Sequence, residues 1–218
     1  MERNQEQLER FLKKKLAART CQNLIGRYCF YHSAMRGEDI LNMWSKNSDT
    51  RIEMPWGVYD GPEGVRRRYL DEQPRHDDLE GRKGNLVVEA LSTMVFEVAE
   101  DTKTARGAWF CQGLQTEVKN GKAECKWLWT KYGVDFIYEN GEWKIWHMAI
   151  FPIIDTPYEV AWNDHPRARI EDWTDVSPDR KPTARYLWNM HPDNKYPMGH
   201  PATPKPYDNF DLEVGYGY

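Results

Sequence analysis

The sequence has no excess of positive charge. Its 30 Lys and Arg residues are outnumbered by 34 Asp and Glu, and the formal net charge is −4. Proteins that bind nucleic acid usually gather Lys and Arg on one face or stripe, where they contact phosphates. The sequence shows no such stripe, so we do not expect nucleic acid as the main partner.

Long apolar runs are missing as well. No apolar segment reaches the roughly 18 residues that a membrane-spanning helix requires. The charged start, MERNQEQLER, does not resemble a secretory signal peptide. We therefore expect a cytoplasmic protein without a membrane partner.

Cysteine pairs of the metal-binding type are also absent. The four cysteines stand far apart, at Cys21, Cys29, Cys111 and Cys125, whereas structural zinc sites use closely spaced pairs. The histidines show no ligand spacing either. We expect reduced thiols, no metal and no cofactor.

Aromatic residues, in contrast, are abundant. The 218 residues include 10 Trp and 12 Tyr, and 40% of the chain is hydrophobic, which is too much for a disordered protein. Aromatic side chains suit a wall around an organic ligand or a subunit contact, with core packing as the alternative. The length fits one domain, or one domain with a long extension.

Apolar residues at helical spacing predict helices in the first third of the chain. In residues 1–19, leucines recur every four positions among charges. This pattern predicts a helical extension that packs on a partner or on the tail, or that frays. The helix continues more strongly over residues 20–36, where Tyr28 and His32 lie one turn apart on the apolar face. A further helix is predicted over residues 61–73.

Four later segments are predicted strands because they alternate or are rich in β-branched residues: 86–98, 105–118, 123–138 and 143–151. Turns of hairpin length join them, which predicts an antiparallel meander. Helices followed by a meander favour an α+β fold, with N-terminal helices packed on one face of a curved antiparallel sheet.

The last two strands form a predicted hairpin. Its turn contains Asn140-Gly141, a pair that tolerates the positive φ angles of tight hairpins. Because strand side chains alternate between faces, His147 is expected to share a face with Trp143 and Ile145. An ionisable group among large apolar side chains indicates chemistry on this face.

The chain changes character after Phe151. Residues 153–218 are rich in proline and still carry many Trp and Tyr. Proline prevents long regular elements, while so many aromatic side chains would be costly to leave in water. We expect a domain at 1–152, with 1–19 as its helical extension. The rest is expected to be an ordered, mostly irregular extension that wraps the domain or a neighbouring subunit, with a solvated linker as the alternative.

Three motifs resemble those of a known family: QNLIGRY in the long helix, GVYDGPEGVRRRY around residue 60, and YENGEWKI at the last hairpin. Their order and spacing make residues 15–152 similar to the SnoaL-like branch of the nuclear-transport-factor-2-like superfamily. The resemblance implies a curved antiparallel sheet around a cone-shaped pocket that N-terminal helices close on one side. The chain is also similar to long bacterial members with a Pro- and Tyr-rich tail. Among these are enzymes that release formaldehyde from lignin-derived diaryl compounds.

The superfamily includes cofactor-free lyases and isomerases, such as the scytalone dehydratase and bile-acid dehydratase types, and proteins that only bind or dimerise, so fold alone does not fix function. Its dehydratase residues transfer only in part. The helix Tyr of bile-acid dehydratase matches Tyr28. Its catalytic Asp falls within residues 32–34, its catalytic His near Ser92 and its pocket Arg near Pro152. The Asp–His pair is therefore expected to be absent as such.

The predicted catalytic set lies in a mostly apolar pocket and consists of His147, His32, Tyr28 and Tyr132. Histidine exchanges protons near neutral pH, and a Tyr hydroxyl can donate to a developing oxyanion. A structural role for each histidine and tyrosine is the alternative. The predicted substrate-binding residues are aromatic, with membership of the core as the alternative: Trp56, Trp109, Phe136 and Trp143.

The sequence and the resemblance together favour a cofactor-independent lyase, either a dehydratase or a formaldehyde-releasing C–C lyase. Its substrate would be a hydrophobic aromatic or polycyclic small molecule. An isomerase or cyclase acting on a steroid- or polyketide-like compound is one alternative, and a non-catalytic ligand-binding or dimerisation module is another. The resemblance also implies a homodimer or a higher homo-oligomer.

Overall fold

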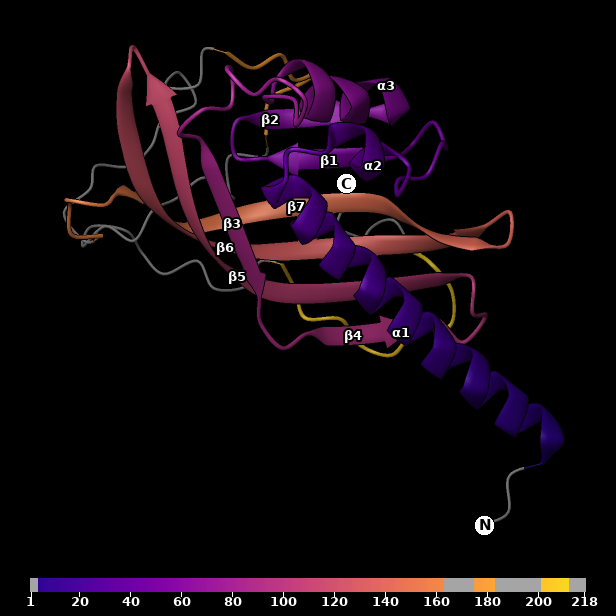
Figure 1. Cartoon of the computed structure of the whole chain (residues 1–218). Helices are drawn as coiled ribbons and strands as arrows, with labels where there is room; N and C mark the ends of the chain where they lie inside the picture. The colour runs from indigo at the N-terminus through magenta and orange to yellow at the C-terminus, as the bar shows by residue number, and fades with distance from the viewer. Residues whose placement is uncertain (1–3, 163–174, 183–200, 212–218) are drawn as a thin grey trace.

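The computed structural model describes residues 4–162, 175–182 and 201–211. Its first element, α1 (Gln5–Ser33), begins at Asn4, whose side chain accepts a hydrogen bond from the Gln7 backbone N–H in a capping box. The second half of α1 buries one face on the sheet, while the first half extends beyond the sheet (Figure 1). The leucines of this extension are exposed: Leu8, Leu12 and Leu16.

Short elements follow α1 and form the top of the domain (Figure 1). They are α2 (Gly37–Leu41), β1 (Arg51–Met54), β2 (Gly57–Asp60) and α3 (Gly61–Arg66). A π-helical turn, η1 (Arg67–Asp71), continues α3. The predicted helix at 61–73 is therefore present, with a widened last turn.

The remaining strands are β3 (Leu86–Leu91), β4 (Val95–Val98), β5 (Thr104–Lys119), β6 (Lys122–Glu139) and β7 (Glu142–Pro157). The sheet order is β2-β1-β7-β6-β5-β3, and β4 also pairs with β5. All pairs are antiparallel except β1 with β7, which run parallel. The sheet is therefore mixed, and the predicted single strand at 86–98 is two strands.

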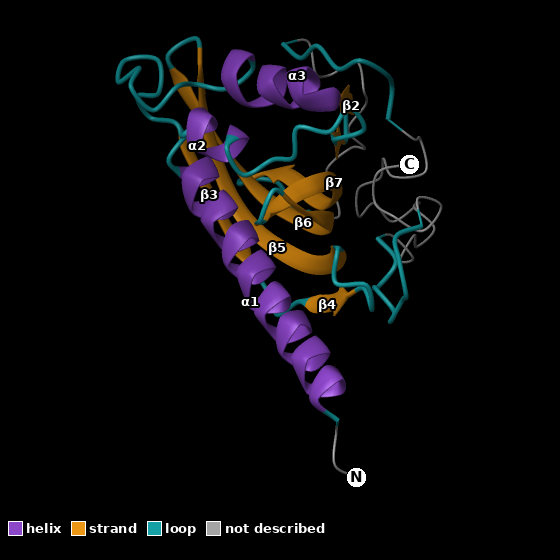
Figure 2. Cartoon of the chain, turned by 90° about the vertical axis from the view of Figure 1, so that its right-hand side faces the viewer, coloured by secondary structure: helices purple, strands orange, loops and turns teal. Residues whose placement is uncertain are grey.

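The sheet has an inner face, which α1 covers, and an opposite outer face (Figure 2). Tyr132, Val134 and Phe136 point inward from β6 and join the core with residues of α1. The Asn-Gly turns have the positive φ angles that were predicted, 50° at Asn140 and 85° at Gly141. The predicted α+β fold, with helices on one face of a curved sheet, is confirmed.

The predicted face of His147 is wrong, because a β-bulge interrupts the last hairpin. Phe136 pairs with Ile145, but the preceding residue, Asp135, pairs with His147, which leaves Trp146 as an extra residue. A bulge of this kind shifts the alternation by one position. Ile145 therefore faces the inner core, whereas His147 faces outward beside Asp135.

Parts of the C-terminal extension pack on their own domain. Residues 175–182 lie against α3 and β2, where Arg180 pairs with Asp60 and Asp179 with Arg67. Residues 201–211 cover the outer face near Tyr207, whose hydroxyl lies 3.2 Å from Thr104 Oγ1. We also expect an ordered chain over the rest of the extension. That part of the prediction falls on residues 163–174, 183–200 and 212–218, which lie outside the described residues.

Candidate active site

A histidine–carboxylate pair joins α1 to β3 on the inner face. His32 Nδ1 lies 3.1 Å from Glu89 Oε2, and the Tyr132 hydroxyl donates to Glu89 Oε1 over 2.9 Å. The side chains of His32 and Glu89 are only 11% and 6% exposed. Two predicted catalytic residues, His32 and Tyr132, therefore meet on a carboxylate that sequence analysis missed.

Glu89 faces inward because β3 alternates. Val87, Glu89 and Leu91 are partly buried, while their neighbours on the strand are exposed. A carboxylate in the inward set of a strand is a signal that sequence analysis could have used. Its partner, however, lies 57 positions away in the sequence.

The carboxyl of Glu89 is held in its ionised form. Burial by itself would raise its pKa, but the charge of His32 and the hydrogen bonds from His32 and Tyr132 outweigh burial. The pKa of Glu89 consequently lies below its usual value. An ionised carboxylate only accepts hydrogen bonds, so His32 Nδ1 carries a hydrogen and donates it to Glu89.

The second ring nitrogen of His32 meets the side-chain amide of Gln73. One amide position lies 2.9 Å from His32 Nε2 and 2.9 and 3.0 Å from the two terminal nitrogens of Arg68. Because a guanidinium can only donate, we assign the amide oxygen to this position. His32 Nε2 then donates to Gln73, and His32 carries a hydrogen on both ring nitrogens.

Tyrosine side chains complete the inner cluster. The Tyr28 ring stacks on His32 with centroids 5.7 Å apart, and the Tyr28 hydroxyl accepts from Tyr69 over 2.9 Å. Burial raises the pKa of both Tyr28 and Tyr132 well above the usual value. Both hydroxyls therefore stay protonated and act as hydrogen-bond donors rather than bases.

The structure does not bring the four predicted substrate-binding residues together. Trp56 lies beside the cluster, with the Arg68 guanidinium 5.2 Å from its ring. Trp109 and Phe136 pack on each other in the core, 6.3 Å apart. Trp143 lies farther along the hairpin, where its ring contacts Tyr138.

His147 belongs to a separate cluster on the outer face. Its Nδ1 lies 3.0 Å from Asp135 Oδ2, and Asp135 Oδ1 lies 3.4 Å from Arg106 Nε. All three side chains are at most 6% exposed. Phe210 of the C-terminal extension covers them, with the Arg106 guanidinium 4.8 Å from its ring. The sheet thus separates His147 from His32.

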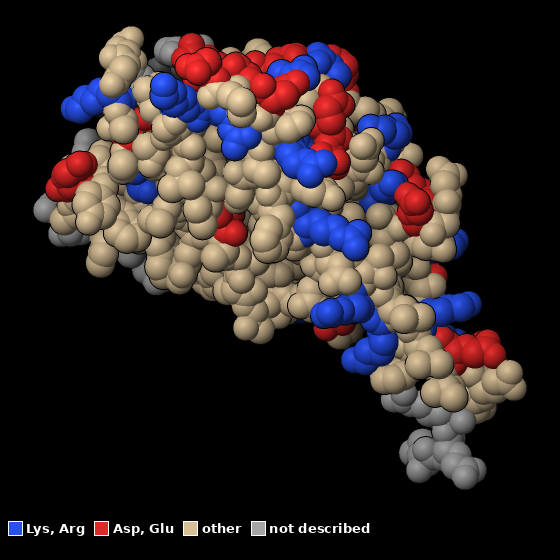
Figure 3. Space-filling model, viewed as in Figure 1, with Lys and Arg blue, Asp and Glu red and all other residues tan. Residues whose placement is uncertain are grey.

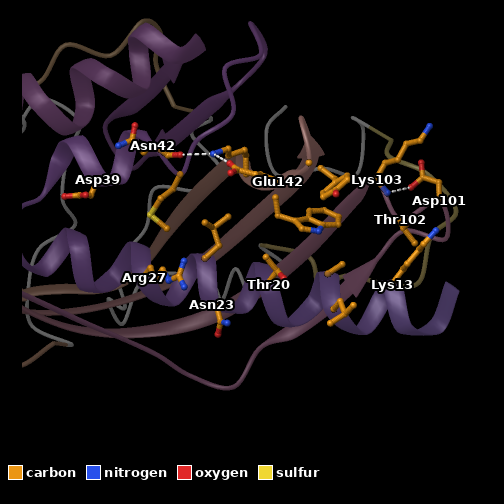
Figure 4. Close-up of a pocket in the computed structure, with 18 of the residues that line it drawn as sticks. Lys13, Thr20, Asn23, Arg27, Asp39, Asn42, Asp101, Thr102, Lys103 and Glu142 are labelled. Carbon is orange, nitrogen blue, oxygen red and sulfur yellow. Dashed lines mark hydrogen bonds and ion pairs between the residues drawn. The ribbon is translucent and has the colours of Figure 1, made fainter. Parts of the chain in front are cut away.

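A groove of about 1060 Å³ opens between α1, the β6–β7 turn and the loop at 101–103 (Figure 4). Trp143 lines this groove together with side chains of both charges. Among them, Lys144 donates a hydrogen bond to the Asn42 carbonyl. Lys and Arg side chains follow α1 across this side of the molecule (Figure 3). None of the four predicted catalytic residues lines the groove.

No three His, Cys, Asp or Glu side chains within the described ranges are grouped to hold a metal ion. Over the same ranges, none of the helices has the length and apolar character to cross a membrane.

Comparison with known proteins identifies a family. A family model described as SnoaL-like domain matches residues 15–149. No curated protein gives a significant match to the chain.

Solved structures share the fold at low sequence identity. A candidate scytalone dehydratase from Novosphingobium aromaticivorans is 14% identical, with 66% of this chain and 88% of that chain covered and a TM-score of 0.51. The hexachlorocyclohexane dehydrochlorinase LinA-type3 from Novosphingobium barchaimii is 16% identical, with coverages of 66% and 92% and a TM-score of 0.53. LinA is 15% identical, with coverages of 72% and 99% and a TM-score of 0.54. At these identities the likeness establishes the fold alone.

Proposed function

Because the chain belongs to the SnoaL-like domain family, we propose that it is a cofactor-independent lyase acting on a hydrophobic aromatic or polycyclic small molecule. One observation carries the proposal: the nearly buried pair of His32 and Glu89, with tyrosine hydroxyls around it. Neighbours of the same fold are named as a dehydratase and as dehydrochlorinases. An elimination reaction is accordingly proposed for this chain.

Dehydration is the reaction that the pair fits best. His32 starts with a hydrogen on both ring nitrogens and gives one to the leaving hydroxyl group, so that the C–O bond breaks and water departs. The neutral imidazole then takes a proton from the neighbouring carbon, an alkene forms, and His32 returns to its first state. Glu89 orients the ring and stabilises its charged form.

Formaldehyde-releasing cleavage begins with the same proton transfer from His32 to the leaving hydroxyl group. After water leaves, His32 takes the proton of a hydroxymethyl oxygen instead, the C–C bond breaks, and the products are an alkene, water and formaldehyde. Tyr28, which keeps its own O–H hydrogen while accepting from Tyr69, is positioned to donate to a developing oxyanion. Isomerisation would instead begin with a neutral His32 ring, which takes a proton from one carbon and returns it to another.

The test is a panel of lignin-derived, steroid and polyketide compounds, incubated with the protein and followed by mass spectrometry. We expect loss of water or formaldehyde from at least one compound, and a rate at least roughly 100-fold lower with Glu89→Gln. Glu100→Gln, which removes an exposed carboxylate that pairs with Lys14, is the control and should keep the full rate.

Two outcomes would contradict the proposal. Equal turnover by Glu89→Gln and the native protein would remove the pair from the chemistry. Binding of panel compounds without any conversion would favour a ligand-binding module.

A homo-oligomer in the cytoplasm is also proposed. Val88, Leu114 and Trp127 lie directly opposite one another on the outer face of three neighbouring strands, and each is about two-fifths exposed. A second copy of the chain could bury such a row of apolar side chains. All four cysteines are free thiols, which suits a reducing compartment.

A further inference from the structure

We propose that Arg68 and His32 form an oxyanion-binding site, whose ligand is a small aromatic molecule carrying an acidic oxygen, either a carboxylate or a phenolate. The side-chain oxygen of Gln73 fills this site in the structure, and the ligand displaces it. The inference rests on the proposed function insofar as the ligand is the substrate of the proposed lyase. Its test, however, does not depend on turnover.

Three hydrogen-bond donors converge on one point in this site. Two guanidinium nitrogens of Arg68 and Nε2 of His32 all lie within 3.0 Å of one amide oxygen of Gln73. Three donors on two basic side chains, aimed at one point, form the arrangement that stabilises negative charge on oxygen. A neutral amide oxygen is a weaker acceptor for them than an anion, because hydrogen bonds between charged groups are stronger.

Arg68 has no hydrogen-bonded counter-charge among the described residues. The residue is 8% exposed, and its Nε atom is buried without a hydrogen-bond partner among the described residues. Its other contacts are the rings of Trp56 and Tyr69, at 5.2 and 5.7 Å. A buried cation without a hydrogen-bonded carboxylate costs free energy that an anionic ligand would recover.

Glu72, a carboxylate on the same segment, is already engaged. Glu72 Oε1 accepts from the backbone N–H and the hydroxyl of Ser177, and its Oε2 accepts from Tyr59. Glu89 acts on Arg68 only through its electrostatic field, since its oxygens are bonded to His32 and Tyr132. Within the part of the chain that the structure describes, neither carboxylate is therefore hydrogen-bonded to Arg68.

The surroundings allow the exchange of Gln73 for a ligand. Gln73 follows the last turn of η1 and is half-buried, so its side chain can turn away without unwinding a helix. The rings of Trp56, Tyr69 and Tyr28 border the site. Aromatic faces of this kind bind flat organic ligands, which is why we assign an aromatic acid or phenol.

Binding to the full-length protein tests the site, with calorimetric dissociation constants for two matched probe pairs. Naphthoate is compared with the neutral naphthamide, and para-nitrophenolate with para-nitroanisole. We expect at least one anion to bind at least roughly tenfold tighter than its neutral partner. Which anion shows the preference separates a carboxylate ligand from a phenolate ligand.

Variants of Arg68 and of Gln73 should change anion binding in opposite directions. Arg68→Met should abolish the preference for the anion, and Arg68→Lys should keep part of it if the loss is not a folding defect. Gln73→Ala should tighten anion binding and leave the neutral probe within about twofold, because the internal competitor is gone. Arg66→Met is the control, since Arg66 pairs with Glu63 and Asp71 outside the site, and it should match the native protein.

Several results would overturn the site. These are an unchanged preference in Arg68→Met, weaker anion binding in Gln73→Ala, and a native protein that binds no anion better than its neutral partner. Anion binding as expected, with no compound of the panel converted, would keep the oxyanion site and reject the lyase. Turnover of a panel compound without a preference for anions would keep the lyase and reject the oxyanion site.

Discussion

His32 and Glu89 place a histidine and a carboxylate on the same two elements that the family resemblance implies, but in exchanged positions. The resemblance assigns the carboxylate to the first helix and the histidine to the first long strand. Here the histidine comes from α1 and the carboxylate from β3. A carboxylate can orient a histidine whichever of the two elements carries each residue. A pair with the two positions exchanged can therefore support the same kind of proton transfer. The absence of the Asp–His pair is therefore compatible with the proposed reaction.

Glu89 should also make stability depend on pH. The effect of burial, which raises its pKa, is outweighed by His32 and by the hydrogen bonds to Glu89, so the folded-state pKa is lowered. A group of this kind stabilises the fold above its unfolded pKa, roughly 4.3, and loses that contribution as pH falls through the folded pKa. Glu89→Gln should accordingly lose less stability than the native protein between roughly pH 6 and pH 3. Urea unfolding at several pH values measures this, and parallel curves for the two proteins would refute it.

At the scale of elements, the bulge at Trp146 decides which chemistry each face carries. It turns Trp146 and His147 toward the outer face, where the Trp146 indole N–H donates to Asp49 and its ring stacks on His147 at 4.2 Å. The pairing of His147 with Asp135 then joins β7 to β6 and, through Arg106, to β5. The outer cluster thus ties three strands together beneath the C-terminal extension.

Replacing His147 should therefore lower stability. His147→Ala leaves the buried carboxylate of Asp135 with one hydrogen-bond partner fewer, and removing one partner of a buried pair of this kind costs about 3 kcal/mol or more. His76→Ala, in an exposed loop, is the control and should change the free energy of unfolding by less than about 0.5 kcal/mol. Urea unfolding at neutral pH gives both values. A loss as small as that of the control would contradict a structural role for the outer cluster.

Local signals in the sequence predicted most elements but not their contacts. The Asn-Gly turns, the long helix and the alternation of β6 all have periodic or turn-specific signatures, and each element is present. The bulge has no such signature, because one extra residue in a strand looks like any other. The pair of His32 and Glu89 was missed for a different reason. It depends on how α1 crosses the sheet, which no local pattern specifies.

For the whole molecule, the outer face of the sheet has a covered end and a partly exposed end. Residues 201–211 protect the charged cluster at one end of the sheet, through Tyr207 and Phe210. At the other end, the apolar row of Val88, Leu114 and Trp127 remains partly exposed. We expect this second region to be the contact between copies of the chain.

Leu114→Lys should therefore shift the protein toward monomer. A charge in the centre of an apolar interface is costly to bury, while the side chain is exposed in the single chain and the fold should be unaffected. Leu16→Lys, on the exposed half of α1, is the matched control and should keep the native mass. Light scattering coupled to size-exclusion chromatography measures both. A native protein that is already monomeric, or a Leu114→Lys protein of native mass, would exclude this interface.

Proton transfer by His32 can be tested by turnover of a substrate identified in the panel. The rate constant kcat of His32→Gln is compared with that of the native protein, with His76→Gln as the control for a histidine replaced elsewhere. We predict a loss of at least roughly 100-fold for His32→Gln and full activity for His76→Gln. A His32→Gln protein that keeps its native kcat would show that His32 does not transfer the proton.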